Sequence, residues 1–157
     1  VSRDIAVLVA PNTSLAVTLL IELVRASAKS LPRDFDIEII EAHHRMKRDA
    51  PSGTALALGR AAAEGRGADI AKAAVLNRSG VHERQDGDIG FAVVRAGDIA
   101  GEHTVLFAGD GEQLVLQHRA ADRAIFARGA LRAAAWLAAR PAGRFFMRDV
   151  LGYKSMS

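Results

Sequence analysis

Residues 41 to 54 read Glu-Ala-His-His-Arg-Met-Lys-Arg-Asp-Ala-Pro-Ser-Gly-Thr, and they join a strand pattern to a helix pattern. Before them, residues 35 to 39 alternate apolar and acidic side chains, which is the period of a half-buried strand. After them, Ser52 opens an alanine-rich helical pattern that ends at Gly65-Arg66-Gly67. The stretch therefore lies where a strand passes through a loop into a helix, a position from which scaffolds commonly present binding residues.

The end of this stretch predicts a binding site for an anion. The first N–H groups of a helix have no partner within the helix, so a helix N-terminus carries partial positive charge. Ser52, Gly53 and Thr54 would present such N–H groups together with two hydroxyls, which suits a carboxylate or a phosphate. Lys47 would add a full positive charge.

Two adjacent histidines, His43 and His44, precede this anion clamp, and an imidazole can exchange a proton near neutral pH. Taken singly, each feature is most simply a solvated loop residue or a helix cap. Their conjunction in one short stretch favours a site where a proton donor stands beside an anion. A metal site is disfavoured, because adjacent strand residues point to opposite faces and no third ligand is evident.

The composition narrows the class of protein. The chain has 157 residues, half of them hydrophobic, which fits one domain or one domain with an appendage. It has no cysteine, which excludes a disulfide framework and suits a reducing cytoplasm, where we expect the protein to act. The net charge of +3 comes from dispersed arginines, and aromatic residues are only 5%, so nucleic-acid binding is disfavoured. No membrane association is expected, because no apolar stretch is long enough to span a bilayer.

The same periodicities predict the other elements. We expect strands at residues 5–9, 89–93, 104–108 and 114–118, helices at residues 15–29 and from Asp122, a loop at 77–87, and a short helix with exposed apolar residues at 145–151. The last three strands of the sheet are expected to be antiparallel, with turns at Gly97-Asp98 and at residues 109–111. His103 and His118 fall in these strands and are expected to be structural or surface residues.

These elements predict an α+β fold. Its sheet is expected to be mixed, mainly antiparallel and about four strands wide, with the helices that start at Leu15 and Ser52 on one face and a helical tail at the C-terminus. The other face keeps apolar residues, so we expect neighbouring subunits to cover it.

Four motifs resemble one known family. The run Glu-Ala-His-His-x-x-Lys-x-Asp-Ala-Pro-Ser-Gly-Thr-Ala from residue 41 is similar to the signature of dihydrodipicolinate reductase. Further matches are Ile-Glu-Ile-Ile-Glu at 37–41, Gly-Phe-Ala-Val-Val-Arg-Ala-Gly-Asp-Ile-Ala-Gly-Glu-His-Thr-Val at 90–105, and Phe-Met-Arg-Asp-Val-Leu at 146–151. The resemblance spans essentially the whole chain.

The resemblance implies an oxidoreductase of the lysine and diaminopimelate route. In the family, a hydride passes from NADH or NADPH to a cyclic unsaturated imine that carries two carboxylates, and the enzyme is a homotetramer. By position, the proposed acids are His43 and Lys47, and substrate carboxylates are held by a second set of residues. That set is His44, Lys47, Ser52, Gly53 and Thr54.

The resemblance also implies contacts to the nicotinamide cofactor. They fall on the loop Ala10, Pro11, Asn12 and Thr13 and on Arg123. The family usually has an aromatic residue or methionine after the asparagine and a glycine three residues later, whereas this chain has Thr13 and Ala16.

The dinucleotide-binding domain of the family is expected to be largely missing, because no G-x-G-x-x-G follows a strand. We expect residues 1–13 to be the end of that domain, residues 14–121 to bind substrate and oligomerise, and residues 122–157 to pack on the missing domain. The chain alone is then expected to bind no NADH or NADPH and to be inactive. The alternative is a noncatalytic module that binds a dicarboxylate and oligomerises.

Overall fold

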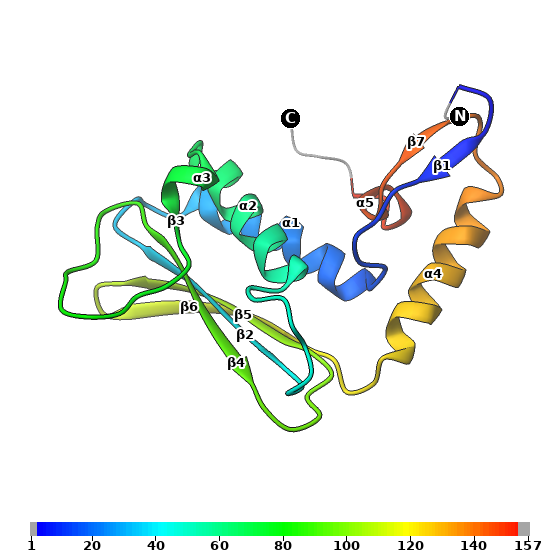
Figure 1. Cartoon of the computed structure of the whole chain (residues 1–157). Helices are drawn as coiled ribbons and strands as arrows, with labels where there is room; N and C mark the ends of the chain where they lie inside the picture. Colours follow the sequence, from blue (N-terminus) through cyan, green and yellow to red (C-terminus); the bar gives the residue numbers. More distant parts are fainter. Residues whose placement is uncertain (1–2, 154–157) are drawn as a thin grey trace. The chain divides into compact units, whose positions relative to one another are not determined.

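The structure, a computed structural model, describes residues 3–153, so the outermost residues of both flanking segments lie outside the described part. The chain divides into two compact units, one made of residues 20–121 and one of residues 1–19 with 122–157 (Figure 1). No helix within the described residues is long and apolar enough to cross a membrane.

The larger unit is built on a mixed sheet of five strands in the order β3-β4-β2-β5-β6. The strands are β2 (Asp36–His43), β3 (Ala74–Val75), β4 (Ile89–Arg95), β5 (Glu102–Gly109) and β6 (Glu112–Arg119). The pairs β3-β4 and β4-β2 are parallel, and the pairs β2-β5 and β5-β6 are antiparallel. The predicted α+β class with a mixed sheet is confirmed.

One detail of the predicted sheet is wrong. The strands β4, β5 and β6 do alternate in direction, but β4 is not the neighbour of β5, because β2 lies between them. The turn at Gly97 therefore joins strands across β2, and the carbonyl of Gly97 accepts a hydrogen bond from Arg45 N at 3.1 Å. A central β2 is the more favourable arrangement, because the strand can then bury Ile37 and Ile39.

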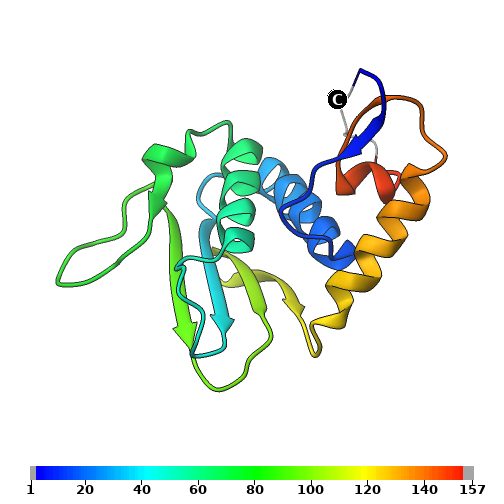
Figure 2. The ribbon, with the colours of Figure 1, turned by 45° about the vertical axis from the view of Figure 1, so that its right-hand side comes forward.

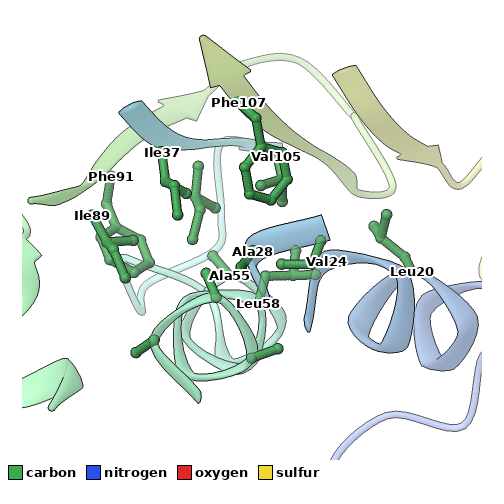
Figure 3. Close-up of a cluster of buried hydrophobic side chains, with 14 residues drawn as sticks. Leu20, Val24, Ala28, Ile37, Ala55, Leu58, Ile89, Phe91, Val105 and Phe107 are labelled. Atoms are coloured by element: carbon green, nitrogen blue, oxygen red, sulfur yellow. The ribbon is translucent and has the colours of Figure 1, made fainter. Parts of the chain in front are cut away.

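Two helices cover one face of this sheet, α1 (Leu15–Ser30) and α2 (Gly53–Arg66), as Figure 2 shows. Between helices and sheet lies a core of alternate strand residues and small helix residues (Figure 3). Phe107, Val105 and Ile39 come from the sheet, and Val24 and Leu58 come from the helices. Alanines on α2 bring the helix close to the strands, which is what its composition predicted. A short helix, α3 (Ile70–Ala73), follows α2.

The ends of α2 agree with the sequence signals. Ser52 is the N-cap, and its hydroxyl accepts a hydrogen bond from Ala55 N. Gly67 closes the helix in the left-handed conformation with φ of 63°, which glycine adopts without steric cost. The anion-binding helix start predicted at Ser52 is therefore a real helix N-terminus.

Replacing Gly65 with alanine should destabilise this unit by about 1–3 kcal/mol, the usual cost of overpacking. A Cβ at Gly65 would lie 2.5 Å from the backbone oxygen of Arg25, so α1 and α2 would have to separate. Urea unfolding followed by circular dichroism measures the loss. Gly53→Ala is the control, since nothing lies within 4 Å of its added Cβ, and equal losses in both variants would contradict the close helix contact.

The smaller unit contains β1 (Ala6–Leu8), α4 (Ala124–Leu137), β7 (Gly143–Phe145) and α5 (Met147–Val150). β1, the strand expected at residues 5–9, pairs in parallel with β7 near the other end of the chain. The helix predicted at 145–151 is wrong in its first residues, because Phe145 belongs to β7 and packs edge-on against Trp136. Met147 is buried instead of exposed.

Candidate functional site

The site begins with two residues on the same face of β2, Glu41 and His43. Successive strand residues alternate faces, so both side chains point toward the helix side of the sheet. Glu41 is only 1% exposed, and its carboxylate lies at the centre of a hydrogen-bond network. Its Oε2 is 2.5 Å from His43 Nδ1, and its Oε1 accepts from Ser52 N at 2.9 Å.

Arg95 completes the bonding of this carboxylate. The parallel register of β2 and β4 places Arg95 beside His43. Its two terminal nitrogens donate to Glu41 Oε2 and Oε1, each at 2.8 Å, which is the bidentate geometry of strong Arg–carboxylate pairs. Arg95 also donates to the backbone oxygen of Asp49 at 2.7 Å, which fixes the loop that leads to the helix start.

A second histidine lies behind the helix start. His103 stands opposite Glu41 in the antiparallel ladder of β2 and β5 and is 4% exposed. Its Nε2 is 3.0 Å from Ser52 Oγ, and its ring meets the ring of His43 edge-on at 5.1 Å between centroids. The Nδ1 atom of His103 has no hydrogen-bond partner within residues 3–153. The N-cap serine is thus held by a buried imidazole.

The loop between strand and helix carries Lys47 and His44. A backbone hydrogen bond of 3.1 Å from Lys47 N to the carbonyl oxygen of His44 closes a turn. Lys47 Nζ donates to both oxygens of Asp49, at 2.8 and 2.9 Å, and Asp49 is otherwise exposed. A carboxylate that binds here would compete with Asp49 for Lys47. Asp49 is exposed, so water can readily solvate it once Lys47 leaves.

Burial and the hydrogen bonds of this network shift the pKa values of Glu41, His43 and His103. Burial opposes ionisation of Glu41, but the hydrogen bonds from Arg95, His43 and Ser52 outweigh it and hold the pKa of Glu41 below its ordinary value. Burial lowers the pKa of His43, with Lys47 and Arg95 acting in the same direction and Glu41 against it. Burial, with the nearby His43, lowers the pKa of His103 to about 4, so this imidazole is neutral at physiological pH.

The structure brings part of the predicted site together. His43, His44, Lys47 and the helix start at Ser52, Gly53 and Thr54 all lie in the larger unit, on the one strand–loop–helix segment. The predicted cofactor residues Ala10, Pro11, Asn12, Thr13 and Arg123 belong to the smaller unit. There, Thr13 Oγ1 donates to the carbonyl of Phe126 at 2.7 Å, Asn12 Oδ1 accepts from Ser14 N at 2.8 Å, and Arg123 precedes α4.

Sequence reasoning gave no chemical role to Glu41 or Arg95, and it expected His103 to be a structural or surface residue. Strand periodicity places Glu41 and His43 on one face, but only the sheet order brings β4 and β5 to either side of β2. The available signal was the motif at 90–105, which contains both Arg95 and His103.

The fold and this site define an α+β domain that can hold a small carboxylate at a helix start beside a proton-exchanging imidazole. The family model described as the C-terminus of dihydrodipicolinate reductase matches residues 16–151, and the chain belongs to this family. The resemblance seen in the sequence motifs is confirmed.

Named relatives agree with this assignment. A 4-hydroxy-tetrahydrodipicolinate reductase of Caulobacter vibrioides is 58% identical over 145 residues, covering 91% of this chain and 56% of that protein. One of Nitrosospira multiformis is 53% identical over 154 residues, covering 98% of this chain and 57% of that protein. The chain thus spans a little over half the length of these curated relatives.

A solved structure also matches. It is described as a dipicolinate-bound dihydrodipicolinate reductase from Paenisporosarcina sp. TG-14, with 27% identity and a TM-score of 0.69. The match covers 88% of this chain and 52% of that one.

Proposed function

We propose that this chain is the substrate-binding and oligomerisation part of a cytoplasmic 4-hydroxy-tetrahydrodipicolinate reductase of lysine and diaminopimelate biosynthesis. The reaction transfers a hydride from NADH or NADPH to a cyclic unsaturated imine dicarboxylate. The observation that carries the proposal is the α2 N-terminus, which one short loop containing Lys47 joins to His43 at the end of β2. The dipicolinate named for the solved relative has the same two carboxylates on a ring and supports it.

Each residue of the segment has a role in this proposal. The helix start at Ser52, Gly53 and Thr54 holds a substrate carboxylate through N–H groups and hydroxyls, with His44 as a further contact. Lys47 supplies the charge for the same anion, and it can leave Asp49 to do so. His43 gives a proton to the reduced product, with Lys47 as the second acid.

Calorimetry with pyridine-2,6-dicarboxylate tests the proposal on this chain directly. We expect saturable binding of one ligand per chain, because charge-assisted hydrogen bonds to an anion need no cofactor. Pyridine-2-carboxylate, which has one carboxylate fewer, should bind more weakly. Absence of any saturable heat with the dicarboxylate would refute the proposed substrate class.

The cofactor is proposed to be bound mainly by a dinucleotide domain preceding residue 14, with contacts from Ala10–Thr13 and Arg123. We further propose that residues 14–121 bind substrate and that residues 122–157 pack on that domain. The present chain alone should then have no measurable affinity for NADH or NADPH and no reductase activity, since no glycine-rich turn offers a place for the pyrophosphate. Nicotinamide fluorescence measures this, and saturable quenching at micromolar concentrations would contradict it.

The open face of the sheet is the proposed surface of a homotetramer. Opposite the helices it exposes Ile40, Val94 and Val115, and Val115 is 52% exposed. Exposed apolar residues gathered on a sheet face are typical of subunit contacts.

We therefore expect an assembly larger than a monomer at tens of micromolar in sedimentation velocity. Val115→Asp should dissociate it, because a carboxylate would be buried without a partner. Glu112→Ala, at the exposed first position of β6, is the control. If the unmutated chain sediments as a monomer, the proposed homotetramer surface is wrong.

A further inference from the structure

Glu41 is a buried carboxylate with every acceptor position in use. Its Oε1 accepts from Ser52 N at 2.9 Å and from Arg95 at 2.8 Å, and its Oε2 faces Arg95 at 2.8 Å and His43 Nδ1 at 2.5 Å. An ionised carboxylate can only accept hydrogen bonds, and four donors match its lone pairs. The proton between Glu41 and His43 therefore belongs to Nδ1 of the imidazole.

This bond determines which nitrogen of His43 is left for a ligand. With Nδ1 bound to Glu41, only Nε2 can exchange a proton with another molecule. Gly101, with φ of 152°, adjoins this atom, and a Cβ there would lie 3.2 Å from His43 Nε2. The glycine thus leaves Nε2 uncovered, while Glu41 holds the opposite edge of the ring.

Glu41 also opposes the surrounding cations. The groups that act on His43 are Glu41 on its own strand, Arg95 on β4, Lys47 in the loop, and the ring of His103 on β5. Burial disfavours a positively charged imidazole most, Lys47 and Arg95 act in the same direction, and Glu41 favours the charged ring. A proton donor must hold its proton before the reaction. The carboxylate of Glu41 beside Nδ1 stabilises this protonated form of His43.

We propose that Glu41, anchored by Arg95, is the positioning residue of this site: it keeps one proton on Nδ1 of His43, so that Nε2 is the atom that takes up the second proton of the ring and delivers it, and it ties that ring to the anion-binding helix start through Ser52 N. One rigid carboxylate then sets the separation between the proton donor and the bound substrate carboxylate. This inference rests on the proposed function, in which His43 is the proton donor to the substrate.

The first test uses the unmutated chain labelled with ¹⁵N in its histidines. Imidazole nitrogen shifts and their coupling to ring protons distinguish the two neutral tautomers by nuclear magnetic resonance. We expect neutral His43 to be protonated at Nδ1 and to have an unprotonated Nε2. A neutral His43 protonated at Nε2 would overturn the proposal without any mutation.

The second test follows the titration of His43 in Glu41→Gln. Removing an anion in contact with the ring should lower the pKa of His43 by at least about one unit, the usual size of a close opposite-charge effect. Glu38→Gln is the matched control, because Glu38 lies on the same strand but pairs with Arg78 on the other face. An unchanged titration of His43 in a folded Glu41→Gln variant, checked by circular dichroism, would overturn the proposal. Failure of the proposed function would appear separately, in the calorimetry with the dicarboxylate.

Discussion

Replacing Lys47 with alanine is expected to weaken binding of pyridine-2,6-dicarboxylate by roughly 1.5–3 kcal/mol, the usual worth of a hydrogen bond to a charged group. Lys47 lies in the loop before the helix start, and its present partner Asp49 is a side chain that is 62% exposed. Calorimetry on this chain measures the loss. Arg48→Ala is the matched control, because Arg48 is an exposed cation of the same loop with no role in the proposed clamp.

His43→Gln should change this affinity far less, because a proton donor acts mainly in the transition state. In a full-length reductase that carries this domain, the order should reverse. There His43→Gln should lower kcat by about 10²–10⁴-fold, the usual contribution of general acid catalysis, and by more than it raises KM. Equal losses of dicarboxylate affinity in the two variants would mean that His43 is a binding residue and not the acid.

Much of the fold could be predicted because local signals and burial agree. The alternation that leads to Glu41, the Ser52 cap and the glycine at residue 67 each fix one element boundary, and the structure has them at those places. Sheet order was harder, since Gly97 reads as an ordinary turn whichever strand it leads to. The choice depends on which strand is most buried, and that is a property of the assembled core.

The proximity of the proposed binding residues was predictable for a related reason. A helix start, a lysine and two histidines fall within one short segment, so their proximity follows from the chain itself. Arg95 and His103 reach the same place from strands far along the sequence, through ladders that no local pattern specifies. The motif at 90–105 contains both residues, but their contacts with Glu41 and Ser52 are visible only in the structure.

The largest effect on stability is expected from Arg95→Met, which removes the partner of a buried carboxylate. Breaking a buried pair from one side typically costs about 3–5 kcal/mol, because an uncompensated charge remains. Arg95 keeps 18% of its side chain exposed, so the lower end of that range is expected. Arg119→Met is the control: Arg119 forms a similar pair with Glu102 but is 67% exposed, and such pairs contribute at most about 1 kcal/mol.

The pH dependence of this loss identifies its cause. The pKa of Glu41 is held below its ordinary value of 4.5, so the pair stabilises the fold above that pH, and its contribution disappears as the pH falls through the folded pKa. Without Arg95, burial raises the pKa of Glu41, and the variant can protonate it sooner. The deficit of Arg95→Met should therefore be largest near neutral pH and shrink as the pH falls through the raised pKa of Glu41 in the variant. His103, with its pKa of about 4, destabilises both proteins in acid alike, so its effect cancels in the difference between them.

Urea unfolding of both proteins between pH 4 and 7.5 measures this stability deficit as a function of pH. A deficit independent of pH would assign the loss to packing and not to the charge of Glu41.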